Sequence, residues 1–501
     1  MKRKLRTAVC LGLTAFVMIS CISGVSAVTD DKILSSGIVA VDPSKVTDDF
    51  LLLSGATEYE QNIIDAANAI KAGAAEFKES VNISKYNINK ADVKTLFNYL
   101  RFENPQLINV ANNFSYNYYS NGVICDFYIN YIFTAGEKNK YFTPFNKAVD
   151  EIVKQAEKQP TDFLKALYVH DYIIANNEYA KEVYDNPDSV SEFVYNAYGA
   201  LVDRRSVCQG YSMAYKAIMD KLNIPVNFAL SEEMNHLWNT VTIGGKTYHV
   251  DLTYDDPVPD IQGNVGHSNF LCTDKEITAT AHSSWTTPST ISGTSYPDRF
   301  WDDIRSKICI NGNEVIYAAY NSTNKSYLER RSLTTNKAST VKSSLNGVRW
   351  LTPSGTKYYT ACLSRIELVG DVLYYSLPDG VNAIAVDGSD DQRVYTLPAS
   401  ANGQLFGFVQ KNGKFYGDLS VEPGVNSKVF ELALSEFKRS VVPGDVTGDG
   451  VVAMLDAIMT QKYALSFLTP DEKVIKAGDM NGDGVITVYD ALLIQKKVLA
   501  M

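Results

Sequence analysis

Cysteine is scarce in this sequence, and the spacing of its cysteines excludes two common kinds of protein. The 501 residues contain seven cysteines, and two of these, Cys10 and Cys21, lie near the N-terminus. Small disulfide-stabilised domains have dense, regular cysteine spacing, which is absent here. No Cys-x-x-Cys or His-x-x-x-His pair occurs either, so a zinc centre is unsupported. The remaining five cysteines are widely scattered: Cys125, Cys208, Cys272, Cys309 and Cys362.

Basic residues are outnumbered, and only one long apolar run is present. Lys and Arg total 47 against 57 Asp and Glu, and this acidic balance argues against nucleic acid or anionic lipid as a partner. The apolar run from Ala8 to Ile22 follows four basic residues and precedes Val25-Ser-Ala27, so we expect residues 1–27 to be a secretion signal. A lipoprotein anchored at Cys21 matches less well. Removing the signal changes the net charge from −10 to −14 and leaves no stretch of membrane-spanning length.

The most informative stretch is Ser206-Val-Cys208-Gln-Gly210-Tyr211. Apolar residues then recur at helical spacing as far as Pro225. Ser206 and Gln209 have the form of a capping box, which predicts a helix that begins at Val207. Cys208 would lie in the first turn, where unpaired N–H groups and the helix dipole favour a thiolate. The same N–H groups are placed to hold an oxyanion beside the thiol.

His236 and Asp251 lie on two predicted strands. Residues 236–243 and 246–254 flank Gly244-Gly245, which is a two-residue hairpin signal. If the two glycines form the whole loop, the numbers of paired residues sum to 489. His236 and Asp251 are then diagonal neighbours on one face of the hairpin, about 7–8 Å apart. This distance lets the carboxylate orient the imidazole after a modest twist.

A thiol, an imidazole and a carboxylate in this arrangement form the nucleophile, base and orienting residue of a thiol acyl-transfer site. We therefore predict that Cys208 is the nucleophile, His236 the general base and Asp251 its partner. Each residue alone has a structural explanation, as a small buried cysteine, a hydrogen-bonded histidine or a turn carboxylate. Their joint occurrence in this order favours the catalytic interpretation.

Other acidic and imidazole groups are interpreted as structural. His170 and Asp171 lie inside a predicted helix over residues 156–178 with no motif nearby, so we expect them to pack or cap. Asp255 and Asp256 are expected to form a turn at the end of a strand. No pair of carboxylates stands in a recognisable glycosidase context, so a carbohydrate-active enzyme is not favoured.

The segment from residue 197 to residue 257 resembles the transglutaminase-like superfamily, whose members share a papain-like Cys–His–Asp core. The resemblance implies the roles given above for Cys208, His236 and Asp251. The superfamily contains transamidases, peptidases, peptide N-glycanase-like amidases and inactive members, so it does not identify the substrate. Tyr254 stands where Trp is common. The matching stretches are Ala197-Tyr-Gly-Ala-Leu201, Cys208-Gln-Gly-Tyr, His236-x-Trp-Asn and Tyr-His-Val-Asp251-x-Thr-x-Asp-Asp-Pro257, with weaker matches at Leu167-Tyr-Val-His170-Asp171-Tyr172, Phe270-Leu, His282 and Trp285.

The flanking regions carry no recognised chemistry. Residues 28–155 mix helical patterns with a hairpin at Asn121-Gly122, and we expect an α+β packing or substrate-shaping region. Residues 296–440 contain short strands, with three similar stretches that start near residues 311, 369 and 411. These stretches resemble propeller blades, but three blades are too few to close a propeller. A small sheet or sandwich that serves as a spacer or binding module is expected.

The C-terminus contains two similar loops, residues 445–456 and 479–490, offset by 34. Each loop has oxygen side chains at positions one, three, five and twelve and glycine at position six, the pattern of a calcium-binding loop. An apolar helix is predicted after each loop. We expect two Ca²⁺ ions, held by Asp445, Thr447, Asp449, Val451 and Asp456 in the first loop and by Asp479, Asn481, Asp483, Val485 and Asp490 in the second.

Paired loops of this kind, with Asp at position twelve and no preceding helix, closely resemble type I dockerins over residues 443–501. The resemblance implies a calcium-folded module that binds a cohesin of a bacterial scaffoldin and places the chain in a cellulosome. Thr447 and Ala453 depart from the usual residues, so the first site is expected to bind calcium more weakly. The positions that usually contact the cohesin hold Met454-Leu455 and Val488-Tyr489, whose inequality argues against symmetric docking.

Together these patterns predict an α+β protein with a papain/transglutaminase-like core, a β-rich domain and a small all-α dockerin. The favoured function is a secreted, extracellular, cellulosome-associated enzyme that hydrolyses or transfers amide bonds of a protein or peptide, such as a plant cell-wall protein. The alternative is a non-catalytic cellulosomal binding or structural component with a degenerate transglutaminase-like fold. The expected regions are a signal peptide over 1–27, an α+β region over 28–155, the catalytic core over 156–295, the β-rich domain over 296–440 and the dockerin over 443–501.

Overall fold

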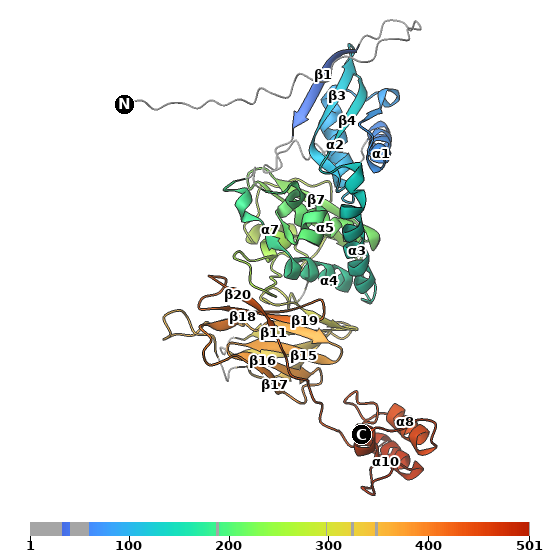
Figure 1. Cartoon of the computed structure of the whole chain (residues 1–501), viewed down its shortest axis with the longest axis vertical. Helices are drawn as coiled ribbons and strands as arrows, with labels where there is room; N and C mark the ends of the chain where they lie inside the picture. Colours follow the sequence, from blue (N-terminus) through green and yellow to red (C-terminus); the bar gives the residue numbers. More distant parts are fainter. Residues whose placement is uncertain are drawn as a thin grey trace.

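The computed structural model of the chain describes residues 33–40, 60–186, 190–296, 298–321, 325–345 and 349–499. The predicted secretion signal lies outside these residues. Four structural regions follow one another in chain order along the long axis of the molecule (Figure 1). Helices and several separate sheets occur together, which confirms the predicted α+β class. In the part of the chain that is described, no helix is both long and apolar enough to cross a bilayer.

The N-terminal region is an antiparallel sheet packed against two helices. Its strands have the order β1-β3-β4-β2. Phe97 of α2 packs against Phe114 of β3 in a common apolar core. The elements are β1 (Ile33–Ala40), α1 (Gln61–Ala75), β2 (Ser80–Asn82), α2 (Val93–Phe102), β3 (Val110–Tyr119) and β4 (Ile124–Tyr131).

The next region, which contains the predicted site, surrounds helix α5 with other helices, a two-stranded parallel sheet and one larger sheet. Every residue of α5 from Cys208 to Met219 is buried, which is typical of a central helix in a packed core. The larger sheet has the order β7-β8-β9, and β8 packs on α5. The elements are α3 (Lys138–Ala156), α4 (Asp162–Asn176), β5 (Glu178–Tyr179), β6 (Arg205–Ser206), α5 (Cys208–Lys221), β7 (Val226–Ser231), β8 (His236–Ile243), β9 (Lys246–Val250), α6 (Leu252–Asp255) and α7 (Asp274–Ala279).

The β8–β9 hairpin confirms the predicted register. Ile243 pairs with Lys246 and Asn239 pairs with Val250, so paired numbers sum to 489. Gly244 and Gly245 form the loop at φ values of +58° and +75°, a backbone conformation that glycine adopts without a steric cost.

Two local predictions near the site are wrong. Residues 251–254 do not continue the strand, because the Asp251 side chain accepts hydrogen bonds from Thr253 N and Tyr254 N and thereby caps α6. Ser206 does not form a capping box. It lies in β6, and its hydroxyl accepts a hydrogen bond of 2.7 Å from Asn177 Nδ2, while Val207 is the N-cap of α5 without a side-chain bond.

The β-rich region forms three consecutive antiparallel sheets in place of a single sheet or sandwich. The sheets begin near the predicted repeat starts, and β14 contacts both β10 and β18, the first strands of the neighbouring sheets. The first two strands of each sheet are joined by a tight turn in which a glycine has a positive φ, at Gly312, Gly370 and Gly413 respectively. The strands are β10 (Cys309–Asn311), β11 (Glu314–Tyr320), β12 (Ser326–Ser332), β13 (Lys337–Lys342), β14 (Ile366–Val369), β15 (Val372–Leu377), β16 (Gly380–Ala385), β17 (Gln392–Thr396), β18 (Gln404–Lys411), β19 (Lys414–Ser420) and β20 (Lys428–Leu432).

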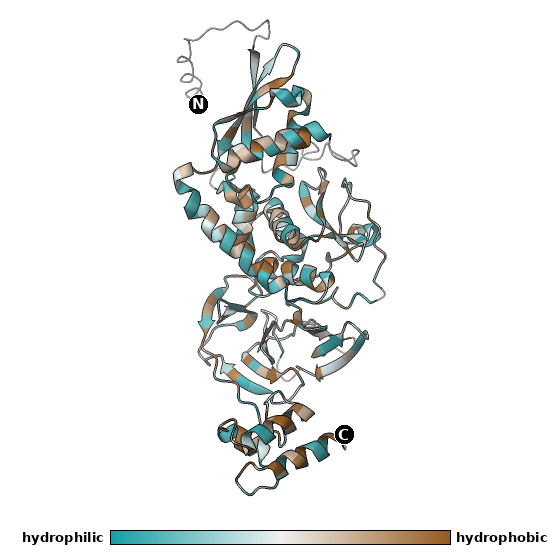
Figure 2. Cartoon of the chain, turned by 90° about the vertical axis from the view of Figure 1, so that its right-hand side faces the viewer, coloured by the Kyte–Doolittle hydropathy of each residue, from teal (hydrophilic) through white to brown (hydrophobic). Residues whose placement is uncertain are grey.

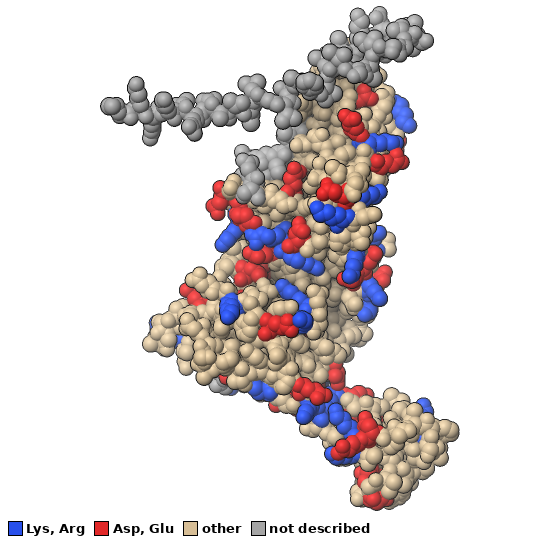
Figure 3. Space-filling model, viewed as in Figure 1, with Lys and Arg blue, Asp and Glu red and all other residues tan. Residues whose placement is uncertain are grey.

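The C-terminal lobe consists of α8 (Met454–Ala464), α9 (Glu472–Gly478) and α10 (Val488–Leu499). Helices α8 and α10 pack together through Ala457 and Ile494. Figure 2 shows further hydrophobic residues along these two helices, and several of their side chains are exposed. Most of the lobe surface seen in Figure 3 is uncharged. The exposed residues are Met454, Leu455, Ile458, Val488, Tyr489, Leu492 and Leu499.

Candidate active site and calcium loops

Cys208 is the first residue of α5, and the local sequence explains why the helix begins there. Val207 is extended, and its N–H donates to Val194 O, so it cannot belong to the helix. Residue 210 has to be glycine, because a Cβ atom at this position would lie 2.6 Å from Val194 O and 2.5 Å from Ser206 Cβ. The Cys208 side chain is buried but retains 7% exposure, at the end of α5 where the helix dipole favours a thiolate.

His236, the first residue of β8, lies between Asp251 and Cys208. Its Nε2 atom is 2.6 Å from Asp251 Oδ2. The other ring nitrogen, Nδ1, is therefore the one available for the hydrogen bond with Cys208. Burial acts to lower the pKa of His236, but the charge of Asp251 and its hydrogen bond outweigh this effect, and together with Cys208 they raise the pKa to about 10. The imidazole is therefore protonated at neutral pH and favours a thiolate beside it.

Asp251 is fully buried and holds its neighbours through both carboxylate oxygens. Oδ1 accepts the backbone N–H groups of Thr253 and Tyr254 at 2.9 and 3.2 Å. Oδ2 accepts from His236 and from His282, whose Nε2 atom lies 2.7 Å away. Burial alone would raise the pKa of Asp251, but the two imidazoles outweigh it and lower the pKa well below its usual range. The structure thus brings the three predicted residues together around an ionised carboxylate.

The role of His282 was not assigned from the sequence. Besides its bond to Asp251, its ring packs against Tyr254 and Trp238, with centroids 4.4 and 4.9 Å apart. No periodicity links residue 282 to residue 251, and only the weaker family match pointed to it. A buried histidine near a predicted catalytic carboxylate is a signal that becomes visible only in three dimensions.

Tyrosines border the site. Tyr254, at the position where the family usually has Trp, is 47% exposed, and its ring lies 4.8 Å from that of His236. Tyr179 and Tyr184 share a hydrogen bond of 2.7 Å between their hydroxyls. Burial raises the pKa of Tyr179, and the charges of Cys208 and Asp251 add to this effect. An incoming chain would therefore meet aromatic surface next to the thiol.

The other described cysteines differ from Cys208. All five are free, buried thiols. Burial raises the pKa of Cys272 to about 12 and also raises the pKa of Cys309 and Cys362, so these thiols remain protonated at neutral pH. Among the described cysteines, Cys208 is the one paired with an imidazole.

In the first predicted calcium loop, Asp445 Oδ1 accepts Gly448 N at 2.7 Å and its Oδ2 accepts Gly450 N at 2.7 Å. Gly450, at position six, has a φ of +89° that permits the sharp turn. Asp456 at position twelve is fully buried, and backbone N–H groups of Thr447 and Ala453 bond its two oxygens. A buried carboxylate opposite other acidic groups fits an added cation.

The second loop repeats this geometry. Asp479 accepts Gly482 N and Gly484 N, each at 2.7 Å, and Gly484 has a φ of +87°. Asp490 is fully buried, and its oxygens accept the N–H groups of Met480 and Thr487. Asn481 and Asp483 contact each other at 2.7 Å. The donor set of oxygen atoms therefore suits calcium in both loops.

Comparison with known proteins assigns the C-terminal part. Residues 443–499 match the model of the dockerin type I domain. Domains of this type bind calcium, and a dockerin implies docking to the cohesin of a scaffoldin in a cellulosome. Among curated proteins, no sequence matches the chain.

Two solved structures are partly similar to the chain. One is the crystal structure of a TGase, with 13% identity over 28% of this chain and 44% of that protein, at a TM-score of 0.21. The other is described as a candidate cysteine protease from Cytophaga hutchinsonii, with 21% identity over 24% of this chain and 40% of that protein, at a TM-score of 0.18. Each likeness covers less than half of the other protein. At such TM-scores they carry no argument about activity, which depends on the site geometry.

The family match agrees with the resemblance to a type I dockerin that the sequence predicted. The core presents a buried thiol, imidazole and carboxylate in contact, and the two C-terminal loops present oxygen ligands. Residues 443–499 form a type I dockerin domain.

Proposed function

We propose that this chain is a thiol-dependent enzyme that cleaves or transfers amide bonds of proteins or peptides. The observation that carries the proposal is the continuous contact from Cys208 through His236 to Asp251, with the Nε2–Oδ2 distance of 2.6 Å. A protonated imidazole between a thiol and an ionised carboxylate is the arrangement that activates a sulfur nucleophile. In this proposal the core, residues 156–295, is flanked by the regions 28–155 and 296–440.

The reaction begins when the Cys208 thiolate attacks the carbonyl carbon of the scissile amide. The N–H groups of the first turn of α5 stabilise the negative charge that develops on the carbonyl oxygen. The C–N bond then breaks, and the His236 imidazolium gives its proton to the leaving amine. The product is a thioester between the substrate acyl group and Cys208.

The neutral His236 imidazole next takes a proton from the acceptor. If the acceptor is water, its oxygen attacks the thioester, the C–S bond breaks and a carboxylic acid is released, with the proton returned to the thiolate–imidazole pair. If the acceptor is a lysine amine, the product is a new amide crosslink. Asp251 keeps the imidazole oriented in both steps. We favour hydrolysis because the dockerin supports attachment to a cellulosome, a setting that we propose to be degradative.

The dockerin supports the proposed location and partner. We propose that the chain is exported, that its two loops bind two Ca²⁺ ions, and that the folded lobe docks to a cohesin. Proteins embedded in plant fibre, such as structural cell-wall proteins, are the proposed substrates. The exposed apolar residues of α8 and α10 are available for a partner surface.

The test uses the mature chain with calcium, incubated with plant cell-wall protein extracts and with unfolded model proteins. New peptide termini or new lysine crosslinks, identified by mass spectrometry, are expected with the unaltered protein and not with Cys208→Ala. Cys362→Ala, which removes another buried free cysteine, is the matched control and should retain activity. Full activity of Cys208→Ala would contradict the proposal.

A second candidate function is a binding component without catalysis. The observation that favours it is a cavity of about 680 Å³ in the β-rich region, a size typical of ligand sites. Tyr395, Phe430 and Asn402 are among its lining residues, whereas Cys208, His236 and Asp251 are not. This function predicts retention of a cell-wall fraction by Cys208→Ala and loss of retention in Tyr395→Ala.

A further inference from the structure

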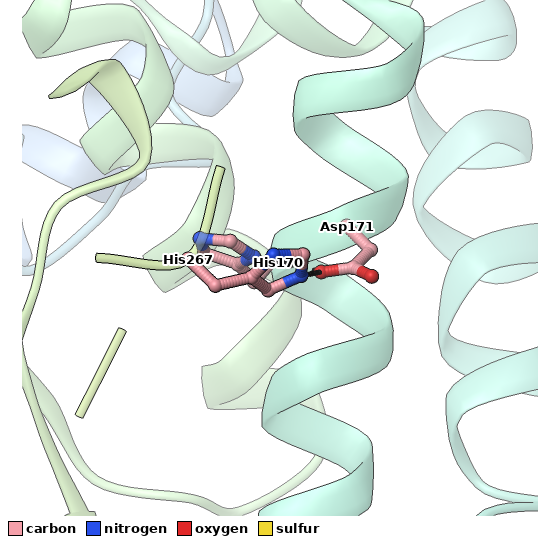
Figure 4. A group of neighbouring side chains, drawn as sticks. All are labelled: His170, Asp171 and His267. Atoms are coloured by element: carbon pink, nitrogen blue, oxygen red, sulfur yellow. Dashed lines mark hydrogen bonds and ion pairs between the residues drawn. The ribbon is translucent and has the colours of Figure 1, made fainter. Parts of the chain in front are cut away.

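A second cluster of titratable side chains is buried beside α4 (Figure 4). It consists of His170, Asp171 and His267. His170 and Asp171 come from α4, and His267 comes from the chain after α6. The sequence favoured a packing role for the first two residues because no motif lay nearby. The structure supplies partners from nearly 100 residues further along the chain.

His170 joins two carboxylates. Its Nδ1 atom is 2.9 Å from Asp171 Oδ1, and its Nε2 atom is 3.2 Å from Asp255 Oδ2. Ionised carboxylates only accept hydrogen bonds, so both ring nitrogens donate and the ring is an imidazolium. Burial acts to lower the pKa of His170, but the two carboxylates outweigh it and raise the pKa to about 9.

The far side of the cluster is anchored to the chain that leads into the β-rich region. His267 Nε2 lies 2.9 Å from Asp171 Oδ1, and His267 Nδ1 lies 3.2 Å from Ile304 O. Asp171 Oδ2 accepts Ile308 N at 2.8 Å. Both ring nitrogens of His170 and of His267 thus have partners among the described residues, and the position of His170 is fixed from both sides.

Asp255 connects this cluster to the predicted catalytic carboxylate. It accepts Asn269 Nδ2 at 3.0 Å and Asn269 N at 3.1 Å. Asn269 O in turn accepts the backbone N–H of Asp251 at 3.1 Å, and Asp255 N lies 3.3 Å from Asp251 O. The backbone of Asp251 is therefore held on both sides by groups that depend on Asp255.

We propose that His170 is a positioning residue for the thiol site. It fixes Asp255, Asp255 and Asn269 fix the backbone of Asp251, and Asp251 orients His236 against Cys208. The inference rests on the proposed function, since it assigns a role in that site. Hydrogen bonds connect His170 to Cys208 without interruption, through residues that are all buried.

Two substitutions at residue 170 separate this role from a general packing role. In His170→Gln the amide nitrogen lies near the position of Nε2 and keeps a donor toward Asp255. In His170→Asn the shorter side chain keeps a donor toward Asp171 and loses the bond to Asp255. Lys216→Met is the matched control, because Lys216 is a buried charged residue of α5 that bonds Asp220 and Val226 O, outside this network.

The measurement is the rate of iodoacetamide alkylation at Cys208 between pH 5 and 10, read by peptide mass spectrometry on the mature chain with calcium. We expect His170→Asn to lower the rate at neutral pH about tenfold, because displacement of Asp251 misorients His236. His170→Gln should stay within about twofold of the unaltered protein. Lys216→Met should keep the pH profile of the unaltered protein, even if its melting temperature falls.

Equal pH profiles in His170→Asn and the unaltered protein would overturn the positioning role. Equal losses in the Asn and Gln variants, accompanied by equal falls in melting temperature, would also overturn it in favour of simple packing. If Cys208 of the unaltered protein alkylates no faster than an isolated thiol, the proposed function itself is wrong. This result differs from those that overturn only the positioning role of His170, so the two failures are distinguishable.

Discussion

His282 Nε2 lies 2.7 Å from Asp251 Oδ2, the same carboxylate oxygen that accepts from His236. The oxygen is therefore held from two directions, while Oδ1 is held by the N–H groups that it caps. Such a fully bonded carboxylate cannot rotate away from the imidazole that it orients. The site is thus a group of four side chains, one more than the three that the sequence predicted.

Substitution of His282 should weaken the site without abolishing it. We expect His282→Leu to reduce the alkylation rate of Cys208 at neutral pH about tenfold, because Asp251 loses one of its two imidazole partners. His282→Gln, which keeps an amide donor, should recover most of the loss. His249→Gln is the control, since His249 is a buried histidine that bonds Asp274 and Trp238 and not Asp251. Unchanged reactivity in His282→Leu would assign His282 to packing alone.

Gly210 should be sensitive to the smallest side chain. In Gly210→Ala the new Cβ would meet Val194 O at 2.6 Å, so the first turn of α5 has to shift. We expect a loss of about 1–3 kcal/mol in the free energy of unfolding together with slower alkylation of Cys208. Gly136→Ala is the matched control, because the nearest atom to a Cβ there is 3.9 Å away. Thermal unfolding and alkylation, measured on both variants, check this prediction. Equal stability of Gly210→Ala and Gly136→Ala would contradict it.

The stability of the core should depend on pH through its buried imidazoles. His170 and His236 have folded pKa values of about 9 and about 10, above the usual 6.5. Their stabilising contributions are fully present below pH 6.5 and are lost as the pH rises through the folded values, each on the order of 1 kcal/mol per pH unit. Asp171 and Asp251 have lowered pKa values, so their contributions are present above about pH 4 and are lost in acid.

Urea unfolding followed by tryptophan fluorescence, at a series of pH values and with calcium present, measures this dependence. Maximum stability is expected between about pH 4 and 6.5. The free energy of unfolding should fall less steeply between pH 7 and 9 in His170→Asn, since this variant lacks one of the two histidines with a raised pKa. Constant stability from pH 6.5 to 9 would show that these imidazoles are not held as cations in the folded core.

Calcium removal should affect the dockerin alone. Asp456 and Asp490 are buried carboxylates, and repulsion among the acidic ligands of each loop remains when the cation is withdrawn. A chelator is therefore expected to make the region after residue 443 sensitive to proteases while Cys208 reactivity persists. Calorimetric titration should give two Ca²⁺ ions for the unaltered chain and one for either Asp445→Ala or Asp479→Ala. A stoichiometry unchanged by both variants would refute the ligand assignment.

Those features whose determinants are local could be predicted from the sequence. The hairpin register follows from Gly244-Gly245, and the position of Cys208 follows from the helical spacing after it. The two C-terminal loops carry their ligands within twelve residues each. In all three cases the residues that define the geometry are neighbours in the chain.

The features that were missed depend on contacts between distant residues. Ser206 has the spacing of a helix cap, but its pairing in β6 and its bond to Asn177 take precedence. His282 and Asp255 acquire their roles from partners 31 and 85 residues away, Asp251 and His170 respectively. The three sheets of the β-rich region were visible as weak repeats, yet the packing of β14 between β10 and β18 was not.

The most direct test of the thiol–imidazole pair is the pH dependence of Cys208 alkylation, compared between the mature protein and its His236→Ala variant. The structure predicts rapid alkylation that changes little across neutral pH in the unaltered protein. In the variant the rate should be slow at pH 6 and rise with pH as for an isolated thiol, which titrates near about 8.5. Alkylation that is slow and equally pH-dependent in both proteins would contradict the account and favour a binding component without catalysis.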